Sequence, residues 1–215
     1  MTELCKIMKD RGSDKGDSWH NYTTFYSEIF EEKRDQIENI FEVGIGTTNP
    51  AFQSHMKPEF TPGGSLRGWR DYFTNANVYG ADIDRDILFE EERIKCFYVD
   101  QLKAAYIQYM WESSGLEDTK FDIIIDDGLH TLPAAIELFA NSKDKLKEDG
   151  IYIIEDVQNH WIDDYNTAFA DVLDEDHRMF VKTIPHHENT TDNTLILIIH
   201  GSDSTYVKHL EGNYE

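Results

Sequence analysis

Several residue types and patterns are scarce in this chain of 215 residues, and each scarcity excludes some classes of protein. Its two cysteines, Cys5 and Cys96, form no spacing motif, so the sequence predicts neither a disulfide framework nor a cysteine-ligated metal. No apolar run approaches the roughly 20 residues that span a bilayer, and no basic segment leading into an apolar stretch marks a signal peptide. We therefore expect a cytoplasmic protein that does not act at a membrane.

Basic residues are scarce as well, with 20 Lys and Arg against 42 Asp and Glu and a formal net charge of −22. The acids are spread along the chain, so the surrounding field repels nucleic acid, which we exclude as a partner. Most of the excess is expected to form a solvated surface. A hydrophobic fraction of 40%, including 13% aromatic residues, predicts a folded globule. Residues 1–215 are expected to form a single domain, with residues 1–35 as a helical N-terminal cap segment.

Short apolar runs alternate with segments whose apolar residues recur at helical spacing. This alternation predicts an α/β fold with a doubly wound, Rossmann-like sheet that is mostly parallel. Five runs are predicted to be its parallel strands: Asn39 to Val43, Asn77 to Ala81, Lys95 to Val99, Phe121 to Ile125 and Ile151 to Ile154. Helices are predicted at Leu66 to Phe73, Leu102 to Trp111 and Leu132 to Leu146, the last one closed by Gly150. An antiparallel hairpin at the sheet edge is predicted from Met179 to Ile184 and Thr194 to His200.

Acidic residues follow two of these predicted strands at the point where each strand ends. Asp126 and Asp127 come after one strand, and Glu155 and Asp156 after the other. The carboxyl ends of neighbouring parallel strands open into one crevice, so these carboxylates are expected to converge. Hard cations such as Mg²⁺ prefer oxygen ligands, and clustered carboxylates are costly unless a cation neutralises them. The sequence thus predicts a divalent metal site, with His130 as a nearby proton acceptor.

Each of these acids also has a purely structural explanation. Asp127 precedes a glycine and suits a turn or a helix cap, and Glu155 and Asp156 suit a strand end that meets a helix N-terminus. We favour the metal site because the two acidic clusters and His130 occur together with a glycine-containing turn of the kind that binds ligands.

A glycine-containing turn follows the first predicted strand, from Phe41 to Thr48. Glycines there let the backbone approach a ligand closely, although a plain tight turn also needs glycine. A nicotinamide dinucleotide is disfavoured because Asn49 replaces the third glycine of its fingerprint. The next strand-terminal acid, Asp82, also lies 82 − 44 = 38 residues after Gly44, where that fingerprint requires about 20.

The motif Glu42-x-Gly44-x-Gly46, followed by Asp82 and Asp100 at the ends of the next two predicted strands, resembles class I S-adenosylmethionine-dependent methyltransferases. The resemblance implies that Glu42 and Gly44 lie at the methionine end of the cofactor, with Gly46 in the same turn. It also implies that Asp82 accepts hydrogen bonds from the ribose hydroxyls and Asp100 from the adenine amino group. A carboxylate suits both roles because it only accepts hydrogen bonds when ionised. The usual third glycine of the family is missing from this turn.

A closer resemblance, from Gly12 to His200, is to the metal-dependent macrolide-sugar O-methyltransferases of the mycinamicin and macrocin type. Their Asp-x-x-His after the fourth strand stands here at Asp127 to His130, and their adjacent Glu-Asp stands at Glu155 and Asp156, 155 − 127 = 28 residues later. The resemblance implies that Asp127, Glu155 and Asp156 hold Mg²⁺ or Mn²⁺ and that His130 is the general base. Asp126 is assigned as a cofactor contact from its place beside the crevice.

Two further segments resemble that family, one with Ser13 to Gly16, His20 to Tyr22 and Tyr26, the other from Gly64 to Phe73. We expect both to form walls of the cofactor and substrate cleft. The remaining predicted cofactor contacts are Lys15, Tyr22, Ser65 and Gln101.

The predicted function is Mg²⁺-dependent transfer of a methyl group from S-adenosylmethionine to a sugar hydroxyl, on a glycoconjugate or a nucleotide sugar. A catechol-type phenol is an alternative acceptor, although a His base favours the less acidic sugar hydroxyl. A non-catalytic S-adenosylmethionine-binding scaffold is a third interpretation, and an oxidative relative of the cephalosporin hydroxylases is a more distant one. A homo-oligomer stays open, because no single surface patch decides it.

Overall fold

The computed structural model describes residues 1–17, 19–187, 189–201 and 204–212. The strands of these residues form one sheet in the order β3-β4-β2-β1-β5-β6-β8-β7. They are β1 (Asn39–Val43), β2 (Asn77–Asp82), β3 (Glu90–Glu91), β4 (Ile94–Tyr98), β5 (Phe121–Asp126), β6 (Leu146–Val157), β7 (His177–Thr183) and β8 (Thr194–His200). Strands β4, β2, β1, β5 and β6 are parallel neighbours, whereas β3, β8 and β7 pair antiparallel. The predicted doubly wound sheet with an antiparallel edge hairpin is confirmed.

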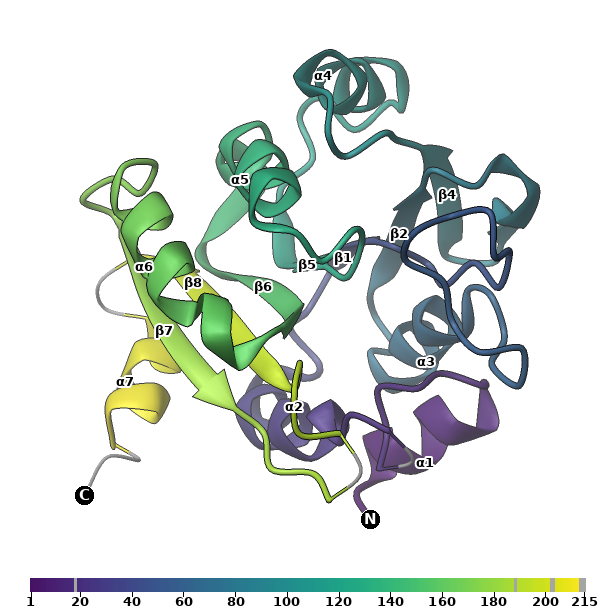
Figure 1. Cartoon of the computed structure of the whole chain (residues 1–215), viewed down its shortest axis with the longest axis horizontal. Coiled ribbons are helices and arrows are strands. Elements are labelled where there is room, and N and C mark those ends of the chain that lie inside the picture. Colours follow the sequence, from purple (N-terminus) through teal and green to yellow (C-terminus); the bar gives the residue numbers. More distant parts are fainter. Residues whose placement is uncertain (18, 188, 202–203, 213–215) are drawn as a thin grey trace.

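Helices cover both faces of this sheet (Figure 1). One face carries α1 (Glu3–Asp10), α2 (Tyr22–Phe30), α3 (Gly64–Tyr72) and α7 (Thr205–Gly212). The other carries α4 (Ala104–Ser113), α5 (Leu132–Ala140) and α6 (Ile162–Ala170). Short 3₁₀ turns are η1 (Glu31–Lys33), η2 (Arg85–Ile87), η3 (Lys143–Lys145) and η4 (Asn159–Trp161). The predicted N-terminal cap segment therefore contains α1, α2 and η1, and α2 lies beside the carboxyl end of β6.

Alternate residues of the central strands point to opposite faces, and both faces are apolar. In β5, Ile123 and Ile125 pack with α1, α2 and α3, whereas Ile124 packs with α4, α5 and α6. In β6, Ile153 and Ile154 divide between the two faces in the same way. A strand that is covered on both faces has no polar side, which explains why these strands are visible in the sequence as nearly continuous apolar runs.

Two expectations about the segment before β6 are wrong. The helix predicted to run to Leu146 ends at Ala140, and Gly150 lies inside β6 instead of closing a helix. Leu146 is buried as a sheet residue, paired with Phe121, so the apolar residue assigned to a helix face belongs to the strand. A Cβ at position 150 would lie 2.8 Å from the carbonyl oxygen of Lys147, so the glycine is required by a close backbone approach within the strand.

Within the described part of the chain, no helix is long and apolar enough to cross a membrane. That residues 1–215 constitute a single domain stays a prediction.

Candidate active site

The turn after β1 lies against the turn after β5, with no room for a side chain between them. Gly44 has a φ of 85°, and a Cβ there would stand 1.8 Å from the carbonyl oxygen of Asp127. The Gly44 N–H donates to the Ala81 carbonyl, and the Asp127 N–H donates to the Val43 carbonyl, each at 2.9 Å. The ends of β1, β2 and β5 are thus tied together, and the acids that follow them lie at one edge of the sheet.

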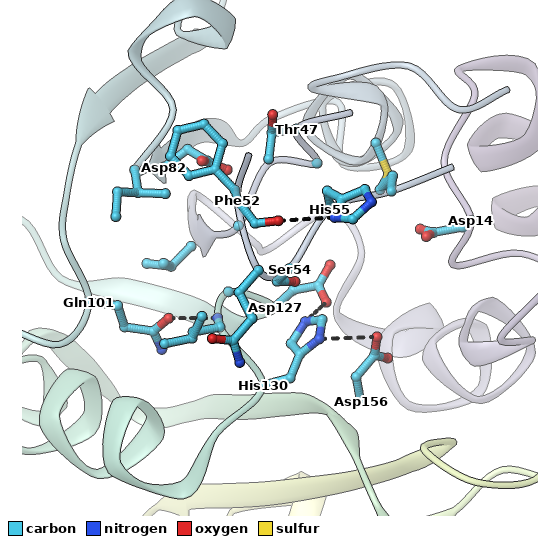
Figure 2. Close-up of a pocket in the computed structure, with 18 of the residues that line it drawn as sticks. Asp14, Thr47, Phe52, Ser54, His55, Asp82, Gln101, Asp127, His130 and Asp156 are labelled. Atoms are coloured by element: carbon cyan, nitrogen blue, oxygen red, sulfur yellow. Dashed lines mark hydrogen bonds and ion pairs between the residues drawn. The ribbon is translucent and has the colours of Figure 1, made fainter. Parts of the chain in front are cut away.

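A cavity of about 570 Å³ opens at this edge (Figure 2). Eight of the predicted site residues line it: Gly44, Gly46, Asp82, Asp100, Gln101, Asp127, His130 and Asp156. They lie at or just after the carboxyl ends of β1, β2, β4, β5 and β6, where ligands bind in open α/β sheets. The sequence-based expectation that these strand ends share one crevice agrees with this geometry.

Asp82 and Asp100 are held at the cavity by local hydrogen bonds. The two carboxylate oxygens of Asp82 accept from the backbone N–H groups of Ile45 and Asp84, each at 2.8 Å. Burial raises the pKa of Asp82, and these donors oppose the rise. Asp100 accepts from the Leu102 N–H at 3.2 Å and pairs with Lys103 at 2.6 Å. Both carboxylates therefore have fixed orientations before any ligand binds.

His130 lies between two carboxylates in this cavity (Figure 2). Its Nε2 is 3.2 Å from Asp127 Oδ1, and its Nδ1 is 3.7 Å from Asp156 Oδ2. Burial lowers the pKa of His130, but Asp156 and Asp127 outweigh burial and raise the pKa to about 10. One candidate ligand atom from each of the three residues lies within 4.8 Å of the others, a grouping that suits a metal ion.

An irregular backbone turns the side chains of Glu155 and Asp156 toward the same helix. Successive residues of a regular strand point to opposite faces. Asp156, however, has a φ of 56°, and the register of β6 against β8 shifts between Ile154 and Val157. Glu155 and Asp156 therefore both meet tyrosines of α2: the Tyr26 hydroxyl donates to Glu155 at 2.6 Å, and the Tyr22 hydroxyl donates to Asp156 at 2.8 Å.

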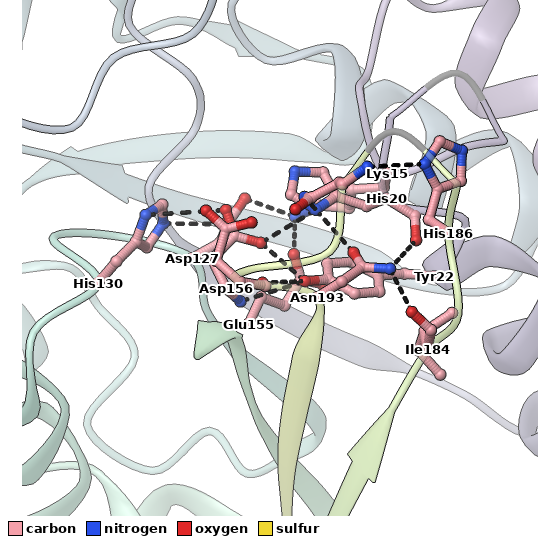
Figure 3. A network of polar contacts seen from close by, with 12 residues as sticks. Lys15, His20, Tyr22, Asp127, His130, Glu155, Asp156, Ile184, His186 and Asn193 are labelled. Carbon is pink, nitrogen blue, oxygen red and sulfur yellow. Dashed lines mark hydrogen bonds and ion pairs between the residues drawn. The ribbon is translucent and has the colours of Figure 1, made fainter. Parts of the chain in front are cut away.

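A buried lysine lies behind the cavity and joins the acids of three strands (Figure 3). The Lys15 ammonium is 2.5 Å from Asp127 Oδ2, contacts Glu155, and is 3.8 Å from Glu42. Burial alone would lower the pKa of Lys15, but the carboxylates, Asp127 first, hold it well above its ordinary value. Lys15 is therefore a permanent cation within the acidic cluster.

Comparison with known proteins identifies the fold and the relatives. No family model matches the chain. A relative from Streptomyces olivaceus, 8-demethyl-8-alpha-L-rhamnosyl tetracenomycin-C 2'-O-methyltransferase, is 33% identical over 181 residues, which cover 83% of this chain and 43% of the relative. Mycinamicin VI 2''-O-methyltransferase from Micromonospora griseorubida is 32% identical over 138 residues, 64% of this chain and 32% of the relative. A solved structure of the MycE methyltransferase from the mycinamycin biosynthetic pathway, in complex with Mg and SAH, has a TM-score of 0.67 at 22% identity and covers 93% of this chain and 55% of that one.

The chain has the fold of the class I S-adenosylmethionine-dependent methyltransferases. Both relatives are named as O-methyltransferases, as the resemblance predicted. The chain spans less than half the length of these two curated relatives.

Six of the predicted site residues do not line the cavity. In the part of the chain that the structure describes, those absent from the cavity lining are Lys15, Tyr22, Glu42, Ser65, Asp126 and Glu155. Lys15 and Ser65 instead line a small recess next to it. Glu42 is fully buried and accepts hydrogen bonds from Ser65 and from the Trp69 indole, each at 2.5 Å. The roles of these residues toward cofactor or metal stay predictions.

Asp126 and Gln101 together hold the turn that carries the candidate base. The Gln101 amide donates to Asp126 Oδ1 at 2.6 Å, and its carbonyl oxygen accepts from the Leu129 N–H at 3.0 Å. Burial raises the pKa of Asp126 to about 6. Asp126 binds the nitrogen of the Gln101 amide, so the amide oxygen faces the turn and holds Leu129. His130 is the next residue in the chain.

One wall of the cavity was not predicted as part of the site. It comes from residues 51–57, after the glycine turn, and from Trp19, whose ring lies under the Lys57 ammonium at 3.6 Å from its centroid. Leu102 and Ile83 also line the cavity and are 52% and 43% exposed. No motif or periodicity marks these residues, and the sole sequence signal is the place of Ile83 and Leu102 next to the strand-terminal acids.

Proposed function

We propose that this chain transfers the methyl group of S-adenosylmethionine to a sugar hydroxyl, with a divalent cation at the acidic cluster and His130 as the general base. The observation that carries the proposal is the position of His130 between Asp127 and Asp156, in the same cavity as Gly44 and Asp82. A candidate base, a cation site and a cofactor site thus share one space.

The cavity suits a nucleoside cofactor. Its volume of about 570 Å³ lies within the range of small-ligand sites, about 300 to 1,000 Å³. Asp82 and Asp100 offer oriented acceptors for hydroxyl and amino groups. Gly46, with a φ of 86°, keeps the backbone of the turn open to close approach.

The acidic cluster suits Mg²⁺, which prefers carboxylate oxygens. Asp127 and Asp156 would hold the cation at the cavity, and Glu155 would complete the predicted ligand set from its place next to Asp156. When bound, the cofactor supplies an electrophilic methyl group and Mg²⁺ supplies a Lewis acid that lowers the pKa of a sugar hydroxyl.

His130 would accept the proton of that hydroxyl. Its raised pKa, about 10, reflects the negative charges of Asp156 and Asp127. Once those carboxylates are neutralised, the pKa falls and the imidazole becomes the neutral base that the reaction needs. Asp127 would keep the ring oriented through its contact with Nε2.

The proposed acceptor is a small glycosylated molecule or a nucleotide sugar. The relative from Streptomyces olivaceus is named for 2'-O-methylation of a rhamnosyl compound, and the relative from Micromonospora griseorubida for 2''-O-methylation of mycinamicin VI. Trp19 gives the cavity an aromatic surface, which suits the apolar face of a sugar ring, and Lys57 lies over the indole.

Substitution of His130 tests the proposal. We expect His130→Ala to retain S-adenosylmethionine binding by calorimetry and to lose about 10² to 10⁴ in kcat on a rhamnoside acceptor. Asp156→Asn, which keeps an acceptor for Tyr22, is expected to abolish the stimulation of turnover by Mg²⁺. His209→Ala, in α7, is the matched control and should behave as the unaltered protein.

Turnover is measured on rhamnosides and other glycosides, with catechol in parallel and with EDTA in a second series. Normal turnover of His130→Ala would remove the base from the proposal. EDTA-sensitive methylation of catechol without methylation of any glycoside would replace the sugar acceptor with a phenol, and absence of S-adenosylmethionine binding would reject the proposed reaction.

A further inference from the structure

The tyrosine hydroxyls of α2 contact the acidic pair of β6, and neither tyrosine lines the cavity. Tyr22 and Tyr26 are four residues apart on the helix, so they lie on one face of it. Both are fully buried, and their hydroxyls point at adjacent residues of the strand end. The N-terminal segment is separated from these partners by 134 and 129 positions in the sequence.

Tyr22 compensates for the irregular backbone at Asp156. Its hydroxyl donates to the Asp156 carboxylate at 2.8 Å and accepts from the Asp156 N–H at 3.3 Å. That N–H lies in the stretch where β6 and β8 lose their regular register. A left-handed, non-glycine residue costs about 1 to 3 kcal/mol and persists only where the surroundings hold it. Tyr22 therefore holds both the backbone and the side chain of this residue.

Tyr26 has a simpler contact with Glu155. Its hydroxyl donates to Glu155 Oε1, and Lys15 contacts the other carboxylate oxygen. An ionised carboxylate has about four lone-pair sites, so two donors leave Glu155 able to bind a cation as well. The orientation of the carboxylate, however, is already set by the donors behind it.

We infer that Tyr22 and Tyr26 are positioning residues for the divalent cation, so that docking of α2 and binding of the cation are linked. The inference rests on the proposed function in placing a cation at Asp127, Glu155 and Asp156. Removal of a group that orients a metal-binding carboxylate typically lowers the affinity for the metal about 10- to 100-fold. Linkage is reciprocal: if the docking of α2 raises the affinity for the cation, then binding of the cation stabilises the docking of α2.

The experiment is calorimetric titration of the full chain with Mg²⁺ alone. We expect Tyr22→Phe and Tyr26→Phe each to weaken Mg²⁺ binding by roughly tenfold. Tyr72→Phe is the matched control: Tyr72 is buried, and its hydroxyl donates to Glu31 at 3.0 Å, away from the acidic pair. Its affinity for Mg²⁺ should equal that of the unaltered protein.

Melting temperatures in EDTA separate a structural role from a positioning role. If the two α2 variants melt lower than the control but bind Mg²⁺ with unchanged affinity, the tyrosines only stabilise the fold and the inference is overturned. Hydrogen exchange gives a readout that needs no variant: Mg²⁺ should slow exchange in residues 22–30 of the unaltered protein, and unchanged exchange there would reject the linkage.

The two proposals fail in different ways. Absence of Mg²⁺ binding by the unaltered protein would contradict the cation of the proposed function, and the inference with it. Tight Mg²⁺ binding by the unaltered protein and by both variants alike would overturn the inference and leave the proposed function intact.

Discussion

His130 and Asp156 both have left-handed backbone, each with a φ of 56°. Such conformations cost about 1 to 3 kcal/mol for residues other than glycine and gather at functional sites. The surroundings hold both in place, His130 through the contact of Leu129 with Gln101 and Asp156 through Tyr22. At the scale of single residues, two of the candidate site residues are thus held in a strained backbone conformation by their neighbours.

The thiol of Cys96 allows a test of pH dependence away from the candidate site. Burial raises the pKa of Cys96 to about 11, above the value of about 8.5 for a free cysteine. The folded state therefore holds the thiol proton more tightly, and the stabilisation is complete below about pH 8.5 and is lost as the pH rises through about 11.

Because only the thiolate reacts with thiol reagents, we expect the alkylation rate to rise about tenfold per pH unit from about pH 7 to about pH 10. The rate is followed with iodoacetamide, and Cys96→Ser, which leaves the fully buried Cys5, supplies the background. A plateau near pH 9 would show that burial does not raise the pKa.

At the scale of elements, the turn after β1 is the tightest connection at the candidate site. Gly44 and Gly115 both have positive φ, 85° and 78°, but only Gly44 is crowded. A Cβ at Gly44 would stand 1.8 Å from a backbone oxygen, whereas none of the described atoms lies within 4 Å of a Cβ at Gly115. Alanine substitutions at these two positions therefore separate the cost of backbone strain from the cost of a steric clash.

We expect Gly44→Ala to destabilise the protein by about 4 kcal/mol, from backbone strain and a clash with the β5 turn. Gly115→Ala, with strain alone, should cost about 1 kcal/mol. Urea unfolding measures both. Equal costs would mean that the two turns can separate and that their contact does not fix the cavity.

At the scale of the whole molecule, the excess of acidic residues destabilises the folded state. The formal net charge of −22 means that negative side chains repel one another, and salt screens that repulsion. Lys147, which contacts Glu38 and Asp122 at the end of the sheet opposite the cavity, is one of few basic residues that join several acids. Local pairing therefore offsets only part of the repulsion.

We expect the melting temperature to rise by a few degrees when NaCl is raised from about 10 mM to about 200 mM, because the Debye length shortens over this range. Differential scanning calorimetry in the presence of EDTA measures the effect without divalent cations. A fall in melting temperature would mean that screened ion pairs contribute more to stability than the overall repulsion removes.

The places of the main parallel strands along the chain, and of the acids at their ends, were determined by the sequence itself. Buried parallel strands are nearly pure apolar runs, so β1 and β5 are recognisable from local composition. The acids that end those runs carry the family motif, and parallel pairing brings strand ends together wherever such runs form one sheet. The helix before β6 was predicted too long, because Leu146 satisfies both a helical spacing and a strand.

Only the tertiary structure decided which groups lie behind the cavity and which line it. Lys15, Tyr22 and Tyr26 reach the acidic cluster across more than a hundred positions of sequence, and no local pattern encodes that contact. The common orientation of Glu155 and Asp156 depends on a left-handed backbone that ordinary strand periodicity contradicts. Local patterns specify apolar faces and strand ends, whereas the orientation of a carboxylate is set by whichever donors the completed fold brings to it.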